Sequence, residues 1–235
     1  MTTAQEPNRH MSVLTEQVNM KAIQSVQHPG KHYVFDKQLG KGVQAAVWLL
    51  RRDEQRFAGK VTSNEWIYEP RKGDPDYWKK RMLSLSRELV FLQMINSPNV
   101  IKQEEVIKTR SNYYSILEFA NGGAIQDLLN LRGRFSEKFA IGALKQIIAG
   151  CQALYEVNVM HRDLKPGNGL SFRRPGLAPS LKLGDVGAAA VLVQAHRSQE
   201  QGLSTQALLQ DVTTFQYVAP EVLRRESYTF SADIW

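Results

Sequence analysis

The fold is decided by the stretch His161-Arg162-Asp163-Leu164-Lys165-Pro166-Gly167-Asn168, which places a carboxylate, an ammonium group and a carboxamide on one short polar segment. Phosphoryl transfer from a nucleotide needs these three groups at this spacing. Asp163 would accept the proton of the attacking hydroxyl, Lys165 would offset charge on the moving phosphoryl group, and Asn168 would hold a metal ion bound to the phosphates. The alternative is a polar turn without chemistry, and the specificity of the pattern argues against it.

The composition is that of a soluble globular protein. Of the 235 residues, 43% are apolar and 23% are charged, and this length suits one domain or two lobes with a substantial core. Apolar residues nowhere run unbroken for the roughly 18 positions that a membrane span needs. The first residues, 1–6, lack the basic start and apolar stretch of a secretory signal.

The single cysteine bears on the cellular compartment. Cys151 cannot form an internal disulfide, which fits a reducing environment. We therefore expect a cytoplasmic protein, with the nucleus as the open alternative. A small buried apolar role is expected for Cys151 rather than that of a reactive thiol.

The net charge of +7 permits attraction to nucleic acid, acidic lipid or acidic peptides. The basic residues are scattered in short groups, however, and none of these groups is typical of a nucleic-acid-binding arm. These groups are Arg51-Arg52, Lys79-Lys80-Arg81, Arg173-Arg174 and Arg224-Arg225. We expect a solvated basic surface and no specific nucleic-acid partner.

The chain divides into three parts by pattern. Residues 1–31 are rich in polar residues without a sustained period and are expected to form a flexible tail. The pattern of residues 32–120 predicts strands with one main helix. The pattern of residues 121–235 predicts helices joined by polar loops. Asn121-Gly122-Gly123 breaks regular structure and is expected to join two lobes.

Alternation and turn residues predict five strands in the first of these lobes. The first strand runs from Tyr33 toward Gly42, and the other four cover residues 46–50, 57–61, 106–107 and 113–117. Residues 63–73 are expected to be irregular, and Asp74-Pro75 predicts the start of a helix that ends at Asn96-Ser97-Pro98. Its apolar face, at spacings of four and three, is Trp78, Met82, Leu85, Leu89 and Leu92.

Two elements are predicted in the second lobe around the stretch from His161 to Asn168, which we call the catalytic segment. Ser136 is a plausible cap for a helix that runs to Tyr155. Residues 181–184 form a short expected strand just ahead of Asp185.

Three motifs together carry a family resemblance. The catalytic segment fits the H-R-D-L-x-x-x-N loop of protein kinases at every specified position. Asp185-Val186-Gly187 lies 22 residues past Asp163 and resembles the Asp-Phe-Gly metal motif, while Ala219-Pro220-Glu221 resembles the end of the activation segment. Over residues 32–235 the chain therefore resembles a eukaryotic protein kinase, and Lys165 is typical of the Ser/Thr type.

The resemblance implies an α+β, bilobal protein-kinase-like fold. Residues 32–120 would form a small antiparallel-sheet N-lobe with one main helix, and residues 121–235 a mostly helical C-lobe. In the family, further helices follow the position of Trp235, so we expect a C-terminally truncated catalytic domain. An apolar surface should then be left open on the C-lobe.

The resemblance also implies a site for ATP and Mg²⁺. The stretch from Gly40 to Ala45 resembles the glycine-rich loop that approaches phosphates, with Ala45 in place of the third glycine. Lys60 would hold the α- and β-phosphates with Glu88 as its ion partner, the alternative for each being a solvated surface charge. The implied nucleotide-binding residues are Leu39, Gly40, Gly42, Val47, Ala58, Lys60, Glu88, Leu117, Glu118, Ala120 and Leu170. Asn168 and Asp185 would be the metal ligands, and Asp163 and Lys165 the catalytic residues.

The implied activity is ATP-dependent phosphorylation of Ser or Thr hydroxyls of a protein substrate. A pseudokinase or scaffold that binds partners without catalysis is the alternative, favoured by Ala45 and by Val186 where the family has Phe. A small-molecule kinase of related fold is opposed by Ala219-Pro220-Glu221 and Thr214, which shape a peptide site in the family.

Arg162 resembles the arginine of kinases that are switched by a phosphate on the activation segment. An upstream kinase would then be a further partner. The candidate hydroxyls are Ser198, Ser204, Thr205 and Thr213, and the sequence gives no basis for choosing among them.

Overall fold

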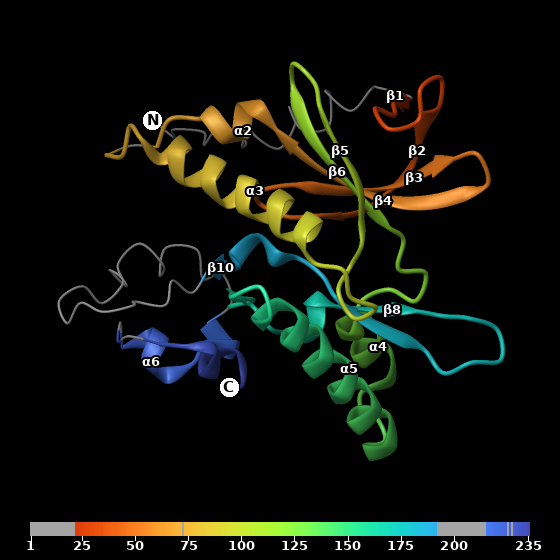
Figure 1. The fold of residues 1–235 in the computed structure, drawn as a ribbon, viewed down its shortest axis with the longest axis vertical. Coiled ribbons are helices and arrows are strands. Elements are labelled where there is room, and N and C mark those ends of the chain that lie inside the picture. Colours follow the sequence, from red (N-terminus) through yellow and green to blue (C-terminus); the bar gives the residue numbers. More distant parts are fainter. Residues whose placement is uncertain (1–21, 72, 192–214, 225, 227) are drawn as a thin grey trace, which may run out of the picture. The chain divides into compact units, whose positions relative to one another are not determined.

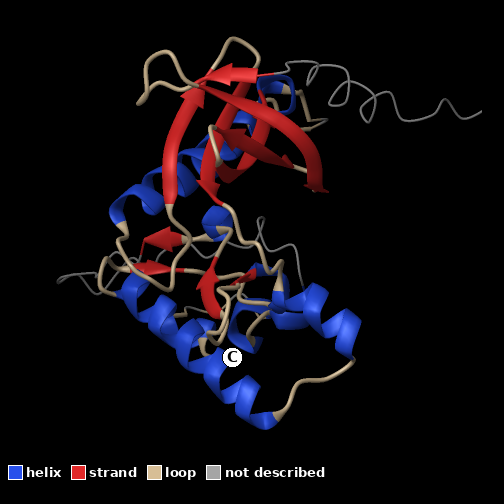
Figure 2. Ribbon diagram, turned by 90° about the vertical axis from the view of Figure 1, so that its right-hand side faces the viewer, coloured by secondary structure: helices blue, strands red, loops and turns tan. Residues whose placement is uncertain are grey.

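The computed structural model describes residues 22–71, 73–191, 215–224, 226 and 228–235. These residues form two compact units. Of the described residues, those up to Trp78 and those of 103–119 form the first unit, and those of 79–102 and 120–235 form the second. Strands dominate the first unit and helices the second (Figure 1, Figure 2). The predicted N-lobe of residues 32–120 included residues 79–102, which here group with the second unit.

The first unit is built on a six-stranded antiparallel sheet of order β1-β2-β3-β4-β6-β5 (Figure 1). Its strands are β1 (Ala22–Gln24), β2 (His32–Lys41), β3 (Ala46–Arg52), β4 (Gln55–Ser63), β5 (Gln103–Lys108) and β6 (Asn112–Glu118). One face carries the hydrophobic core of the unit, because alternate residues of successive strands point to the same side. The core residues are Ile23, Tyr33, Leu50, Phe57, Val61, Ile107, Tyr114 and Ile116.

The sheet begins ten residues earlier than the predicted tail allowed. Ile23 of β1 pairs with Tyr33 of β2, and the turn that follows β1 is held by hydrogen bonds to the carboxylate of Glu105 on β5. The prediction of a tail through residue 31 is therefore corrected for residues 22–31. Residues 1–21 lie outside the described part of the chain.

The connection after β4 is more regular than expected. The predicted irregular stretch 63–73 contains a short helix, α2 (Asn64–Tyr68), whose N-cap Ser63 accepts a hydrogen bond from the Trp66 amide at 3.0 Å. The main helix, α3 (Tyr77–Met94), begins three residues after Asp74.

The buried face of α3 also differs from the predicted stripe. Leu85 and Leu92 are buried as predicted, but Glu88 and Phe91 join them. Trp78 at the start of the helix is 37% exposed. Glu88, a polar residue outside the predicted apolar stripe, is therefore among the most buried residues of the helix.

The second unit contains α3 from Lys79 onward, the helices α4 and α5, and several short elements. The elements that follow α3 in this unit are α4 (Ile125–Arg132), α5 (Glu137–Tyr155), β7 (Val159–Met160), η1 (Pro166–Asn168), β8 (Gly169–Phe172), β9 (Ser180–Leu183), η2 (Val186–Ala188), β10 (Ala190–Val191), η5 (Phe215–Tyr217), α6 (Pro220–Leu223) and η6 (Phe230–Asp233). Ser136 caps α5 by accepting from the Phe139 amide at 3.3 Å, which confirms the predicted cap. A Cβ on Gly150 of α5 would lie 2.6 Å from the Asn99 carbonyl oxygen and 2.9 Å from Leu183 of β9, so this close approach requires glycine.

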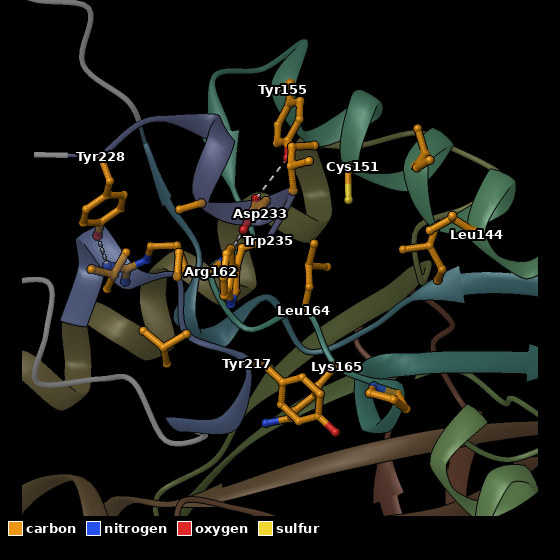
Figure 3. Close-up of a pocket in the computed structure, with 18 of the residues that line it drawn as sticks. Leu144, Cys151, Tyr155, Arg162, Leu164, Lys165, Tyr217, Tyr228, Asp233 and Trp235 are labelled. Carbon is orange, nitrogen blue, oxygen red and sulfur yellow. Dashed lines mark hydrogen bonds between the residues drawn. The ribbon is translucent and has the colours of Figure 1, made fainter. Parts of the chain in front are cut away.

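An apolar pocket of about 600 Å³ opens in the second unit, between α5 and the last described residues (Figure 3). Its lining includes Leu144 and Cys151 of α5, Leu164 of the catalytic segment, and Trp235. Leu144 is 58% exposed and Trp235 is 73% exposed. The open apolar surface that the sequence predicted on this part of the chain is thus confirmed.

Cys151 should be a slow-reacting thiol, although it lines this pocket. It is only 5% exposed, and burial, with a smaller contribution from Asp233, raises the pKa of the thiol to about 12 from 9.0. At pH 8 this leaves about 1,000-fold less thiolate than an unperturbed cysteine has. We expect iodoacetamide to alkylate the native protein more than about 10-fold more slowly than the urea-unfolded protein. With one cysteine in the chain, mass spectrometry reads the rate directly, and equal rates in both states would contradict this placement.

Candidate active site

The catalytic loop follows β7 and is held by the carboxylate of Asp233. Oδ2 of Asp233 accepts a hydrogen bond from the His161 amide and Oδ1 accepts one from the Arg162 amide, each at 2.7 Å. Arg162 has φ of 65°, a left-handed conformation that is costly for a residue with a side chain. The two charge-assisted bonds stabilise this turn, and the turn directs the next residue, Asp163.

The imidazole ring of His161 connects the loop to the strand that leads to Asp185. The ring is fully buried, and its Nδ1 accepts a hydrogen bond from the Asp163 amide at 3.3 Å. Nε2 lies 3.1 Å from the carbonyl oxygen of Gly184. Because Nδ1 accepts, the ring proton is assigned to Nε2, which donates to that carbonyl.

The three candidate groups of the loop meet at one carboxylate. Nζ of Lys165 lies 2.6 Å from Oδ2 of Asp163, and Nδ2 of Asn168 donates to the same oxygen at 3.0 Å and to the Asp163 carbonyl at 2.8 Å. The side chains of Asp163 and Lys165 are 12% and 21% exposed, so both are partly desolvated. Because both donors bind Oδ2, Oδ1 of Asp163 is the oxygen suited to an incoming hydroxyl.

Asn168 and Asp185 are brought close by the hairpin of β8 and β9. The Gly184 amide donates to the Asn168 carbonyl at 2.8 Å, and Asp185 follows Gly184 in a left-handed conformation with φ of 53°. Nδ2 of Asn168 donates to Asp163, so Oδ1 of Asn168 is the side-chain atom suited to bind a cation.

This donor set fits Mg²⁺. The ion takes oxygen ligands and is usually bound through one or two carboxylates together with phosphates and water. The described ranges contain no cluster of three or more His, Cys, Asp or Glu side chains suited to a metal ion. A magnesium ion here would therefore take its remaining ligands from a nucleotide and water.

Glu88 of α3 lies beside the Asp185-Val186-Gly187 motif. A Cβ placed on Gly187 would be 3.1 Å from Oε2 of Glu88 and 3.2 Å from Oδ1 of Asp185. Oγ of Ser84, one turn earlier on α3, donates to the Gly187 carbonyl at 2.9 Å. The predicted ion pair of Glu88 with Lys60 would join residues of different units and stays a prediction.

In the first unit, strand register gathers the predicted nucleotide-binding residues on the face opposite the core. Val47 of β3 pairs with both Gly40 of β2 and Lys60 of β4, and Ala58 of β4 pairs with Leu117 of β6. Directly opposite residues share a face, and so do residues two apart on one strand. Val47, Ala58, Lys60 and Leu117 therefore lie on one partly exposed face.

Gly40, near the end of β2, and Gly42, in the connection to β3, are not needed for packing within this unit. A Cβ on Gly40 would meet nothing within 4 Å, and one on Gly42 would meet only the Ala45 carbonyl oxygen at 3.7 Å. The Gly42 amide donates to that same carbonyl at 2.9 Å, which closes the turn, and Ala45 itself is buried. The space above both glycines is thus available for close approach by a ligand.

The remaining nucleotide-binding candidates are divided between the units. Leu39 precedes Gly40 in β2, and Glu118 ends β6 in the first unit. Ala120, whose carbonyl accepts from the Gly123 amide at 3.1 Å, and Leu170 of β8 belong to the second unit. Their convergence with the first unit around an adenine stays a prediction.

The activation segment lies mostly outside the described residues. This applies to Thr214 and to the candidate phosphosites Ser198, Ser204, Thr205 and Thr213. Ala219 precedes α6, and the Arg162 guanidinium donates to the Ala188 carbonyl at 2.6 Å and to the Tyr228 hydroxyl at 3.2 Å. A contact between Arg162 and a phosphate therefore stays a prediction.

Comparison with known proteins identifies the family. A model of the protein kinase domain matches residues 33–235, which is most of the chain. The chain belongs to the protein kinase family. The family prediction, with Ser/Thr kinases among its relatives, and the α+β kinase fold class are thereby confirmed.

The relatives of this kinase domain include kinases of Arabidopsis, Dictyostelium and rice. It is 29% identical over 204 residues to the serine/threonine-protein kinase ATG1a of Arabidopsis thaliana, covering 86% of this chain and 29% of that protein. It is 30% identical over 207 residues to myosin light chain kinase A of Dictyostelium discoideum, covering 87% and 63%. It is 33% identical over 206 residues to CBL-interacting protein kinase 26 of Oryza sativa subsp. japonica, covering 86% and 38%. The kinase domain thus spans less than two thirds of the length of each of these relatives.

No helix among the described residues is both long and apolar enough to cross a membrane.

Proposed function

We propose that this kinase domain transfers the γ-phosphate of MgATP to Ser or Thr hydroxyls of a protein substrate. The observation that carries the proposal is the meeting of Lys165 and Asn168 at Oδ2 of Asp163. A carboxylate with one oxygen held by two donors presents its other oxygen in a fixed direction. That arrangement suits a hydroxyl group that must lose its proton while its oxygen attacks phosphorus.

Four residues of the second unit each have a defined part in this proposal. Asp163 orients the substrate hydroxyl and accepts its proton, and Lys165 lies close enough to offset charge on the transferred group. Oδ1 of Asn168 and the carboxylate of Asp185 hold Mg²⁺. Bound MgATP supplies the phosphoryl group, and its cation neutralises charge on the phosphates.

The Ser/Thr preference rests on Lys165 and on the similarity to kinases named as serine/threonine-protein kinases. The same proposal includes a cytoplasmic site of action. It also includes an upstream kinase that phosphorylates the activation segment.

A scaffold function without catalysis is the second candidate, and Val186 is the observation that favours it. The side chain is fully buried, but it is smaller than the Phe that the family has beneath the helix. Looser packing there would weaken the coupling between α3 and the metal motif.

Magnesium-dependent transfer separates the two candidates. The purified chain, ATP labelled on the γ-phosphate and a mixed protein substrate should give label on Ser or Thr, and EDTA should abolish the labelling because Asn168 and Asp185 then lack their cation. Nucleotide binding is measured in parallel by calorimetry with and without Mg²⁺. Binding without any transfer would support the scaffold, and label found only on tyrosine would contradict the Ser/Thr assignment.

A further inference from the structure

The metal motif of this kinase is tied to α3 by a hydroxyl group that the catalytic mechanism does not use. Oγ of Ser84 donates to the carbonyl oxygen of Gly187 at 2.9 Å. Ser84 and Glu88 stand four residues apart, so they project from the same side of α3, and both approach Gly187. All of these residues belong to the second unit.

The hydrogen bond completes a pattern in the short helix η2, which follows Asp185. The carbonyls of its three residues, Val186, Gly187 and Ala188, each accept a hydrogen bond from a different source. Val186 accepts from the Ala189 amide at 3.0 Å, Gly187 from Ser84, and Ala188 from the Arg162 guanidinium at 2.6 Å. The turn is therefore fixed by its own backbone, by α3 and by the catalytic loop at once.

The residue that benefits is Asp185. Its left-handed backbone, with φ of 53° and ψ of 68°, is unfavourable for an aspartate unless neighbouring structure holds it. The neighbour on its C-terminal side is η2. Val186 contributes apolar contacts there, but these are not directional and cannot by themselves fix the orientation of the turn.

We propose that Ser84 is a positioning residue for the metal ligand Asp185, acting through the Gly187 carbonyl. The hydroxyl supplies from α3 a directional link between helix and metal motif, at a site where the buried Val186 supplies only packing. This inference rests on the proposed function for its kinetic consequence. Its structural consequence, the rigidity of residues 185–189, is independent of activity.

Ser84→Ala tests the inference, and the chain provides a matched control. Ser86 lies two residues further along α3, is exposed, and donates to the Met82 carbonyl at 2.7 Å within the helix. Ser86→Ala therefore removes a serine hydroxyl from the same helix without touching η2. Ser84→Thr keeps the donor and should restore what Ser84→Ala loses.

Two readouts are compared across these variants. Ser84→Ala should need about 10-fold more Mg²⁺ for half-maximal phosphoryl transfer, because outer partners of a metal ligand typically affect metal affinity by that much. Hydrogen–deuterium exchange at residues 185–189 should become faster in Ser84→Ala. Ser86→Ala and Ser84→Thr should both stay close to the unsubstituted protein.

The results distinguish this inference from the proposed function. Equal magnesium requirement and equal exchange in Ser84→Ala and Ser86→Ala would overturn the role of Ser84 and leave the proposed function standing. If the unsubstituted chain transfers no phosphate, the proposed function fails. The exchange comparison then decides about Ser84, with unchanged exchange overturning the inference and faster exchange supporting it.

Discussion

Replacing Asp163 by asparagine should lower the rate of phosphoryl transfer by about 10²- to 10⁴-fold, the usual contribution of a positioned general base. Asparagine keeps the size of the side chain, but its amide cannot accept the proton of a substrate hydroxyl. It also removes the negative charge to which Lys165, at 2.6 Å, and Asn168, at 3.0 Å, now donate. The measurement is the turnover rate at saturating MgATP with the protein substrate found for the unsubstituted chain.

Nucleotide binding separates this effect from a loss of structure. MgATP affinity should change by no more than a few-fold in Asp163→Asn, because the proposed metal ligands Asn168 and Asp185 remain. Glu54→Gln, an exposed carboxylate in the turn between β3 and β4, is the control for loss of one negative charge. A turnover rate in Asp163→Asn within 10-fold of the control would remove Asp163 from the role of base.

Replacing Glu105 by alanine should lower the free energy of unfolding by about 3 kcal/mol, as expected when one partner of a buried charged network is removed. Its carboxylate accepts from Ser25 Oγ at 2.6 Å, the Tyr33 hydroxyl at 2.7 Å, and the amides of Val26 and Gln27 at 2.9 and 3.1 Å. The side chain is 1% exposed, so these donors would lose their acceptor in a region with little access to water. Urea denaturation measures the loss, and faster hydrogen exchange at residues 22–34 locates it.

The neighbouring carboxylate is the control. Glu104 is bonded to Arg52 at 2.9 Å, but its side chain is 25% exposed, so Glu104→Ala should cost about 1 kcal/mol. Equal losses in the two variants would contradict the special place given to Glu105.

The stability contributed by Glu105 should depend on pH with a definite sign. Burial alone would raise the pKa of this carboxyl, but the hydrogen bonds from Ser25, Tyr33 and the amides of Gln27 and Val26 outweigh it and hold the pKa below its ordinary value of 4.5. The contribution is therefore fully present above pH 4.5 and is lost as the pH falls through the lower pKa of the folded protein. The difference in stability between the unsubstituted chain and Glu105→Ala should narrow accordingly in acid.

Features that depend on neighbours in sequence were predictable. Asp163, Lys165 and Asn168 lie on one loop, so their convergence follows from local turn geometry. The capped start of α5 and most strands of the first sheet also follow from local patterns, because two-residue alternation and a side-chain cap act within a few residues.

Features that depend on distant partners were not predictable in the same way. Ser25 meets Glu105 across 80 residues of sequence, and a three-residue strand such as β1 has no detectable period. The apolar stripe placed Glu88 only at its border, because a stripe counts only apolar residues, whereas the structure buries it. Ser84 was missed because its partner is a backbone carbonyl 103 residues away, and no residue type marks a backbone acceptor.

The attachment of β1 and the following turn to Glu105 has a practical consequence for recombinant work. The family match begins at residue 33, and a shortened gene that starts there would delete β1 and the turn that binds Glu105. β1 pairs with β2 only at His32, Tyr33 and Val34, so the deletion would uncover that end of the strand. Unpaired strand edges invite intermolecular pairing and precipitation. Expression trials should therefore start no later than Ala22.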